Sequence, residues 1–328
     1  MMGDRGDEKT MADVVCLGIL VADIFGSPVD AVPAAGQLVS LDHYLLSAGG
    51  CACNTAADLR RLGYAPGVLG KVGDDLFGGF VLRELERLGI DASYVKKSRT
   101  RPTSCTFILN VRGEDRRYIH CFGANADFSI QDIDWACLDG ARALYVGGYL
   151  AMPSFRPAHL VELFREARRR GVITALDVVI PAGASSLLED VRQALSFTDV
   201  FLPNDDEARA LTGRADPLEQ ADVLAGINPD CTIVITQGRR GVLVRRGSQT
   251  LRAGVFKVDS IDESGSGDAF DAGFLAGMLE GWPLERSVQF ASAVGASCTR
   301  ALGCHAGVFT RPEAEEFLSS HRLEITRV

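Results

Sequence analysis

The sequence predicts an α/β protein with a doubly wound, mostly parallel central sheet, helices on both faces of that sheet, and a small β-sheet lid. Short apolar segments alternate with segments of helical periodicity along most of the 328 residues, which is typical of strands joined by helices. Two stretches instead alternate apolar and polar residues, the pattern of half-exposed strands. Hydrophobic residues make up 47% of the chain and charged residues 23%, a balance that supports a buried core.

The regular elements follow in chain order from this rhythm. The first apolar run is short, as expected for a strand buried on both faces, and Gly63 and Gly89 stop the first two helical segments. A strand-like segment from Val258 leads into the last predicted helix, which carries Phe270, Phe274 and Met278 on one face. The predicted strands are 14–19, one near 68, 143–146, 172–177, 200–202, 232–236 and a hairpin of 242–245 and 250–253, and the predicted helices are 54–62, 76–88, 160–170, 187–195 and one that begins at the turn 265–268.

The two alternating stretches, 37–46 and 103–121, predict the small sheet. It is inserted into the main domain at about 33–48 and 100–124, and a turn at 112–115 makes a hairpin of the second stretch. Such a flap covers a pocket and excludes water from a reaction. The alternatives are a contact between two copies of the chain or a decoration without function, and we expect a homodimer through this lid.

Charge, termini and cysteines limit the class of partner. The formal net charge of -9 argues against nucleic acid and membrane surfaces, which attract basic faces, and no apolar run approaches the roughly 20 residues that span a bilayer. The charged start lacks the apolar core of a signal peptide, so we expect a disordered tail over 1–12, a domain over 13–328 and a cytoplasmic protein. The nine cysteines are scattered and expected as reduced thiols, and the isolated pair Cys51 and Cys53 predicts no zinc site.

The strongest local signal is the turn 262–268, Asp-Glu-Ser-Gly-Ser-Gly-Asp, before the last predicted helix. Gly265 and Gly267 let backbone N–H groups converge on an anion, and the helix dipole adds a positive field. Such an anion hole stabilises a phosphoryl group in transfer. Asp268 lies in the first helical turn, where the dipole favours the ionised form that a general base needs. The alternative is a plain turn with a helix-start aspartate.

Two signature regions carry a resemblance to a known family. The segment 49–56, Gly-Gly-Cys-Ala-Cys-Asn-Thr-Ala, and the turn 262–268 together resemble the ribokinase-like (PfkB) carbohydrate kinases. The resemblance extends from residue 14 to about 312, with further matching segments at 70–78, 204–207 and 236–241. It implies an ATP-dependent sugar kinase of ribokinase-like fold, in which Asp268 is the catalytic base and the backbone of Gly265, Ser266 and Gly267 forms the anion hole.

The same resemblance implies which residues bind the ligands. A sugar would contact Asp23, Gly49, Gly50 and Asn54, because a carboxylate accepts hydrogen bonds from two vicinal hydroxyls. The nucleotide would contact Thr236, Gly238, Gly241 and Ser292. Asn204 and Glu207 would order the water shell of Mg²⁺, which keeps several waters in proteins. A K⁺ site would be formed by Asp262, Ser264, Cys298, Ala301, Gly303 and Gly307.

Several positions depart from the pattern of the family. Glu263 stands where threonine is usual, Ser266 where alanine is usual, and Ser292 where many members have asparagine. The segment after Asp177 lacks the polar residues of many relatives, and Cys51 replaces a commonly polar residue in the substrate loop. These departures leave the acceptor open. The alternatives are a nucleoside kinase, with Tyr149, Phe122 and Phe155 as candidates for an aromatic platform, and a non-catalytic sugar-binding protein.

Overall fold

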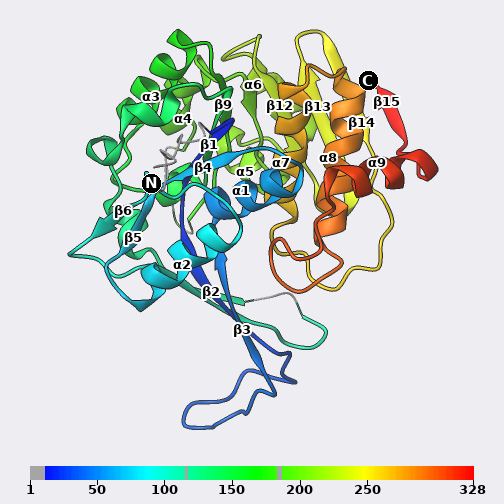
Figure 1. Cartoon of the computed structure of the whole chain (residues 1–328). Helices are drawn as coiled ribbons and strands as arrows, with labels where there is room; N and C mark the ends of the chain where they lie inside the picture. Colours follow the sequence, from blue (N-terminus) through cyan, green and yellow to red (C-terminus); the bar gives the residue numbers. More distant parts are fainter. Residues whose placement is uncertain (1–11, 115–116, 182, 184–186) are drawn as a thin grey trace, which may run out of the picture.

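A central sheet runs through the body of the molecule, and helices cover both of its faces (Figure 1). The computed structural model describes residues 12–114, 117–181, 183 and 187–328. Over these residues the central sheet has nine strands in the order β15-β14-β13-β12-β11-β10-β9-β1-β4. The pairs from β4 to β12 are parallel and those from β12 to β15 are antiparallel. The strands are β1 (Val14–Gly18), β4 (Pro66–Leu69), β9 (Ala143–Gly147), β10 (Ile173–Leu176), β11 (Val200–Phe201), β12 (Thr232–Thr236), β13 (Val242–Arg246), β14 (Gln249–Ala253) and β15 (Ile325–Arg327).

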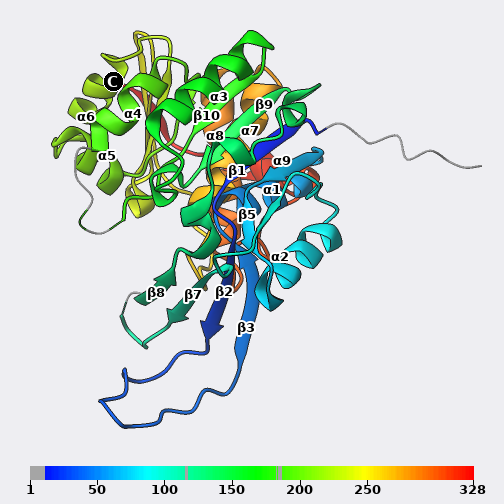
Figure 2. The ribbon, with the colours of Figure 1, turned by 90° about the vertical axis from the view of Figure 1, so that its left-hand side faces the viewer.

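Two helical layers enclose this sheet, as Figure 2 shows from the side. Successive side chains of β1 point to opposite layers, since Val14 and Cys16 pack in one hydrophobic core and Val15 and Leu17 in the other. This arrangement confirms the predicted doubly wound α/β fold. The first layer contains α1 (Cys51–Arg61), α2 (Leu76–Arg87), α7 (Ser266–Leu279), α8 (Leu284–Cys298) and α9 (Arg311–Ser320), and the second contains α3 (Pro157–Arg169), α4 (Leu187–Leu195), α5 (Asp205–Thr212) and α6 (Pro217–Ala225).

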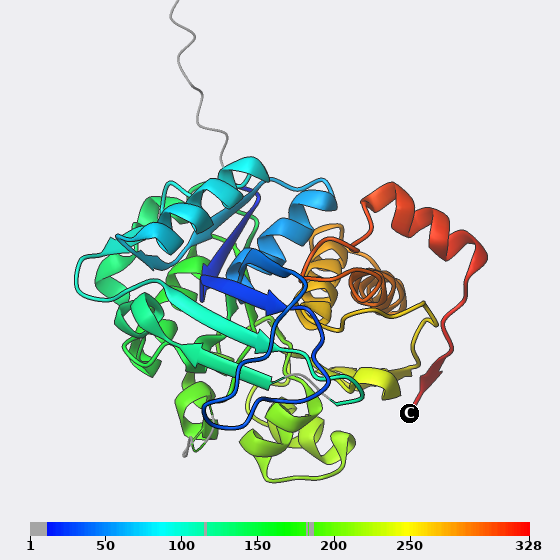
Figure 3. The same cartoon turned by 90° about the horizontal axis from the view of Figure 1, so that it is seen from below.

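A four-stranded sheet, called the lid here, projects from the body in the order β3-β2-β7-β8 (Figures 1 and 3). Its strands are β2 (Val21–Gly26), β3 (Tyr44–Gly49), β7 (Ser104–Leu109) and β8 (Arg117–Cys121), and the short pair β5 (Lys71–Gly73) and β6 (Lys96–Ser98) lies apart from it. The lid includes β2, which the sequence did not assign to it, because β2 is almost wholly buried and shows no alternation. Strand β3 starts at Tyr44 instead of residue 37, and Asp115 of the predicted turn lies outside the described residues.

The segment before α7 is not a strand, contrary to the prediction from Val258. The chain leaves the central sheet after β14, and the apolar residues that follow pack on helices instead. The Phe256 ring, for example, lies 5.1 Å from the ring of Phe317 in α9. Residues 254–265 thus form an irregular connection, which positions the turn before α7.

The remaining expectations concern cysteines, membranes and the N-terminal tail. All nine cysteines lie in the described part of the chain and have free thiols. Among the described residues, no helix has both the length and the apolar content needed to cross a bilayer. Residues 1–11 of the predicted tail lie outside the described residues.

Candidate active site

The glycine-rich turn caps the N-terminus of α7. Gly265 has a left-handed backbone with φ of 74°, and a side chain there would lie 2.5 Å from the carbonyl oxygen of Cys304. Gly267, in the first helical turn, has open space where a Cβ would lie. The turn therefore needs glycine at position 265 for its shape, whereas glycine at 267 keeps the N-terminus of the helix accessible. This is the geometry of an anion-binding helix N-terminus.

Asp268 follows in the first turn of α7 and contacts the segment that begins α1. The Nδ2 atom of Asn54 donates a hydrogen bond of 2.8 Å to its Oδ2 atom. Burial raises the pKa of the Asp268 carboxyl, and hydrogen bonds from Asn54 and Cys51 lower it only in part. The helix dipole, the one effect that the sequence reasoning considered, favours the ionised form, but desolvation outweighs this positive field, so the net shift of the pKa is upward. A raised pKa makes the carboxylate a stronger proton acceptor.

The predicted sugar residues converge beside this aspartate. Asp23 is buried in β2, and its carboxyl group fills the space where Gly49 would carry a side chain, 1.9 Å from the Cβ position. Gly50 has φ of 87° and lies against the carbonyl of Ile19. The Oδ1 atom of buried Asn54 lies on the same side, 3.8 Å from that Cβ position on Gly49, and has no hydrogen-bond partner among the described residues. A buried acceptor of this kind suits a ligand hydroxyl.

The lid contributes to this corner through residues that the sequence did not single out. Burial raises the pKa of Asp23 to about 6, a hydrogen bond from Thr106 of β7 opposes the shift, and the charge of Asp268 adds to it. The Thr106 hydroxyl also contacts Nδ1 of His120 in β8 at 3.0 Å. Neither residue belongs to a recognisable motif, and only the strand register brings them opposite Asp23.

A cavity of about 490 Å³ lies at the N-terminus of α7. Ser266 and Gly267 line it, so the anion hole opens into this space. The unpredicted lining includes apolar Phe256 and Phe270, Lys257, and Glu263, whose carboxylate pairs with Arg239 at 3.0 Å. All the residues predicted to bind nucleotide also line it, namely Thr236, Gly238, Gly241 and Ser292.

Asn204 and Glu207 begin α5 and cap each other. The Oδ1 atom of Asn204 accepts from the Glu207 amide at 2.9 Å, and Oε2 of Glu207 accepts from the Asn204 amide at 2.8 Å. Asn204 also forms a bridge to Thr236, at the end of β12. Burial raises the pKa of Glu207 to about 7, and the charge of Asp268 adds to the shift. Asn204 thus caps a helix and at the same time lies beside Thr236, a residue that lines the cavity.

The residues of the predicted cation site lie in one cluster of loops. Oδ1 of buried Asp262 accepts from the Ser264 amide at 3.1 Å and from its hydroxyl at 2.8 Å, and Oδ2 accepts from the Gly303 amide at 3.0 Å. The Cys298 thiol donates to the carbonyl of Cys304 at 3.1 Å. Gly307 packs against the Cys298 carbonyl and the Ala301 amide, where a Cβ would lie within 3.1 Å of both.

Asp177, which the sequence analysis did not place in the site, joins it from the end of β10. Its Oδ2 atom accepts from the Gly148 amide at 3.0 Å. Gly148 follows β9, the parallel neighbour of β10. Carboxyl ends of neighbouring parallel strands are the usual ligand-binding edge of such sheets, so topology was the available signal.

The candidate aromatic platform is mostly absent from the site. Tyr149 and Phe155 are buried in the core beneath α3 and α4, with ring centroids 6.2 Å apart. Phe122 is partly exposed at the end of the lid, where its ring meets that of His120 at 4.8 Å. Only one of the three rings is therefore near the acceptor corner.

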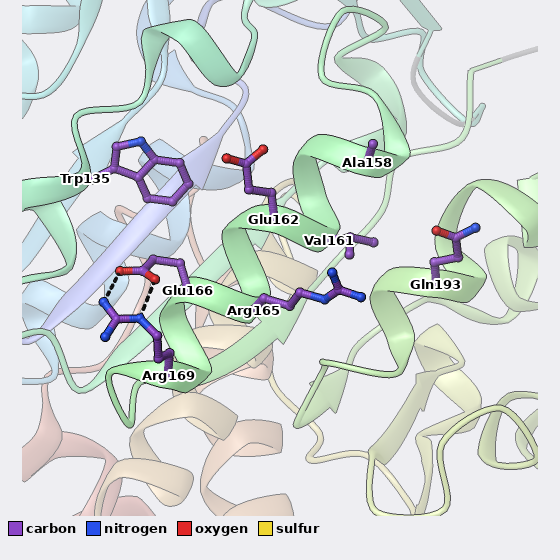
Figure 4. Close-up of a pocket in the computed structure, with 8 residues that line it drawn as sticks. All are labelled: Trp135, Ala158, Val161, Glu162, Arg165, Glu166, Arg169 and Gln193. Carbon is purple, nitrogen blue, oxygen red and sulfur yellow. Dashed lines mark hydrogen bonds and ion pairs between the residues drawn. The ribbon is translucent and has the colours of Figure 1, made fainter.

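A second hollow lies on the opposite helical layer, between α3, α4 and Trp135 (Figure 4). Its charged groups come mainly from α3, and Glu166 pairs with Arg169 at 2.7 Å. Arg165 stacks on Phe197, 4.8 Å from the ring centroid. Glu166, Arg169 and Arg165 thus have partners within the protein. None of the predicted site residues lines this hollow.

The fold and this site define a class of α/β phosphotransferases with an aspartate at an anion-binding helix N-terminus. The sequence pattern of the pfkB family carbohydrate kinases matches residues 11–311, and the chain belongs to this family. It is therefore a kinase with an alcohol group as acceptor, as the sequence predicted.

Known proteins agree with this assignment and differ in their acceptors. The chain is 28% identical to the ribokinase of Haemophilus influenzae over 92% of this chain and 97% of the relative. It is 30% identical to the ATP-dependent ribose-1-phosphate kinase of Halopiger xanaduensis over 82% of this chain and 86% of the relative. The structure of Arabidopsis thaliana ribokinase complexed with ribose and ATP has the same fold, with a TM-score of 0.80 at 22% identity over 95% of this chain and all of the other.

Proposed function

We propose that the protein transfers the γ-phosphoryl group of ATP to a hydroxyl of a monosaccharide or sugar derivative. The observation that carries this proposal is the 2.8 Å hydrogen bond between Asn54 and Asp268. It joins the loop with the acceptor groups to the first turn of α7, where the anion hole lies. The two substrates would thus meet at one carboxylate.

On the acceptor side, Asp23 and Asn54 would orient the sugar. The Asp23 carboxylate accepts hydrogen bonds from two hydroxyls, and the unpartnered Oδ1 atom of Asn54 accepts a third. The reacting hydroxyl then lies against Asp268, which takes its proton as the oxygen attacks phosphorus. Holding both groups in place supplies much of the rate enhancement in phosphoryl transfer.

On the nucleotide side, ATP would occupy the 490 Å³ cavity with its phosphates toward Ser266 and Gly267. Besides burial, the charge of Asp268 raises the pKa values of Glu207 and Asp177, and the charge of Glu207 raises that of Asp177; none of the three carboxyl groups forms an ion pair with a described residue. This uncompensated negative charge fits a divalent cation. Asn204 and Glu207 would hold the water shell of Mg²⁺, which neutralises charge on the phosphates when bound.

A K⁺ ion would fit the loop cluster behind the anion hole. Asp262 is 8% exposed and supplies a buried negative charge. Its oxygens organise Ser264 and Gly303, so carbonyl groups of the same loops are held around it. We assign this role to Asp262, Ser264, Cys298, Ala301, Gly303 and Gly307.

The exposed face of the lid supports a homodimer. Phe107 of β7 and Ile119 of β8 are register partners, and they are 49% and 61% exposed. Neighbouring apolar side chains of this size usually mark a contact with another surface. Replacing both residues with aspartate is expected to yield monomers in light-scattering measurements, whereas an unchanged mass would contradict a contact at the lid.

A nucleoside as acceptor is less well supported. Base recognition needs an exposed aromatic ring in the pocket, and Tyr149 and Phe155 are enclosed in the core. Phe122 alone remains as a candidate. A non-catalytic sugar-binding role is not favoured either, because Asp268 keeps its contact with the acceptor loop.

A substrate screen tests the proposal. Purified full-length protein with ATP and Mg²⁺ is mixed with hexoses, pentoses, sugar acids and nucleosides, and ADP release and the melting temperature are recorded. A true acceptor is expected to raise the melting temperature by mass action and to release ADP. ADP release with nucleosides alone would overturn the proposal in favour of the alternative acceptor.

A further inference from the structure

Three metal-binding side chains from distant segments meet at the catalytic end of the site. The Cys51 sulfur and one carboxylate oxygen each from Asp177 and Asp268 all lie within 4.8 Å of one another. Cys51 begins α1, Asp177 follows β10, and Asp268 lies in the first turn of α7. The spacing of Cys51 and Cys53 gave no indication of this cluster, because its other members are far away in the sequence.

The packing around these groups holds them in position. The Gly148 amide fixes Asp177 at 3.0 Å, and Asn54 fixes Asp268 at 2.8 Å. The Cys51 sulfur lies against Gly148, where a Cβ would be only 3.4 Å away. The Cys51 thiol has one proton and lies close enough to both carboxyl groups to share it with either of them. A metal ion would therefore replace one shared proton in an otherwise preformed arrangement.

A second observation points to a ligand at the same place. Asn54 is 4% exposed, and its Oδ1 atom has no hydrogen-bond partner in the described part of the chain, although its Nδ2 atom contacts Asp268. Neither Asp177 nor Asp268 forms an ion pair with a cationic side chain of the described residues. The cluster thus combines excess negative charge with a free buried acceptor next to it.

The donor set distinguishes between metals. Mg²⁺ requires oxygen ligands and binds few protein groups, so a thiol contributes nothing to its binding. A thiolate with two carboxylates suits Zn²⁺, which accepts sulfur and oxygen donors in tetrahedral sites and binds a fourth ligand in an open position. The presence of Cys51 therefore changes the metal preference of this corner.

We propose that Cys51, Asp177 and Asp268 form an inhibitory site for Zn²⁺ and similar thiol-binding divalent cations. On binding, the Cys51 S–H bond breaks, a Zn–S bond forms, and the proton passes to solvent. The two carboxylates donate electron pairs, and no group is oxidised or reduced. The bound metal then engages the carboxylate of Asp268, which can no longer accept the proton of the acceptor hydroxyl, so phosphoryl transfer stops. Inhibition rests on the proposed function, whereas binding does not.

Binding is tested first, with Co²⁺ as a coloured substitute for Zn²⁺ and without ATP or sugar. The full-length protein is expected to show a near-ultraviolet sulfur-to-cobalt charge-transfer band that Zn²⁺ abolishes. Cys51→Ser is expected to lose the band, and Cys121→Ser, which removes an exposed thiol of the lid, is expected to retain it. A band that is absent from the wild type, or that persists in Cys51→Ser, overturns the proposal.

Inhibition is tested next at fixed MgATP, with each variant compared with its own rate without Zn²⁺. Cys51→Ser is expected to need at least about 10- to 100-fold more Zn²⁺ for half inhibition, since even outer-shell changes weaken metal sites by this factor. Asp177→Asn is a second variant with the same expectation, for use if Cys51→Ser does not fold. Equal sensitivity of wild type and variants would place Zn²⁺ at the Mg²⁺ position and overturn the proposal.

Discussion

The active site has a nucleotide end, at the cavity beside α7, and an acceptor end, beside Asp23 and Asn54, and the two ends differ in the kind of residue that forms them. At the nucleotide end, the cavity is lined mainly by the connections after β12 and before α7, and five of its lining residues are glycines. At the acceptor end, Asp23 and Thr106 are side chains of the lid strands β2 and β7, and only Asn54 belongs to a motif, at the start of α1. Backbone geometry requires glycine at fixed positions and leaves a motif, whereas side chains on a strand leave none. The type of reaction can therefore be predicted from the sequence, whereas the identity of the acceptor cannot.

The largest expected effect is a difference in stability between alanine substitutions at two glycines of the nucleotide end, Gly265 and Gly267. Gly265→Ala introduces a side chain at positive φ that overlaps Cys304, and strain and overpacking together are expected to cost about 2 to 5 kcal/mol of unfolding free energy. Gly267→Ala has open space and is expected to fold normally but to bind ATP less tightly, because its Cβ projects into the anion hole. Urea unfolding and ATP titration measure both. Equal losses of stability would contradict the geometry of this turn.

The acceptor end is expected to respond independently. Asp23→Ala removes hydrogen bonds to a charged acceptor, and the loss of one such bond costs about 1.5 to 3 kcal/mol, so the KM of the sugar is expected to rise by at least about 10- to 150-fold. The KM of ATP is expected to stay unchanged. Ser47→Ala, at the register partner of Asp23 on β3, is the matched control. Parallel changes in both KM values would show that the two ends are not separate.

The helix that connects the two ends contains a destabilising residue. Asp58 of α1 is 0% exposed, and neither carboxyl oxygen has a hydrogen-bond partner among the described residues. Burial raises its pKa well above the ordinary value. Asp58→Ala is expected to raise the free energy of unfolding by about 1 to 3 kcal/mol at pH 8.

The same substitution has a predicted pH dependence. A raised folded-state pKa means that the unfolded chain releases the Asp58 proton first, so the wild type loses stability as pH rises above about 4. The advantage of Asp58→Ala is therefore expected to shrink as pH falls from 8 to 4.5. Urea titrations at several pH values measure it. A constant difference would indicate that Asp58 is hydrated or paired in solution.

The smallest expected effect is the pH dependence of sugar binding. Burial raises the pKa of Asp23 to about 6, and only the ionised form accepts hydrogen bonds from both hydroxyls. The KM of the sugar is expected to rise about tenfold between pH 7 and pH 5, since the ionised fraction of the group falls from about nine-tenths to about one-tenth over this range. In Asp23→Asn this slope is expected to disappear, and its persistence would assign the titration to another group.

Much of the fold was predictable because its signals are local. The helix Leu187–Leu195 and the strand Thr232–Thr236 were predicted with the bounds that the structure gives them. Glycines such as Gly50 and Gly265 adopt the positive φ angles that the turns of the site require, and they are visible in the sequence. The lid was only partly predictable, since β2 is buried like a core strand and its pairing with β7 joins segments far apart in the sequence.

Two properties of the site depend on the folded chain and have no sequence signal. Asp177 reaches the site only because β9 and β10 are neighbours, and no residue spacing indicates this. The raised pKa of Asp268 results from burial, which the hydrogen bonds from Asn54 and Cys51 oppose only in part, whereas local reasoning considered only the helix dipole. Long-range packing determines both properties.

The central claim is that Asp268 accepts the proton where the two ends meet. Turnover with the best acceptor of the screen and the dissociation constant of ATP are measured for Asp268→Asn and for the control Asp271→Asn, whose carboxyl accepts a hydrogen bond from Tyr145 at 3.0 Å. Asp268→Asn is expected to lower turnover about 10²- to 10⁴-fold and to leave ATP binding unchanged, while the control retains turnover. Equal turnover of Asp268→Asn and wild type would contradict the role of Asp268 as the base.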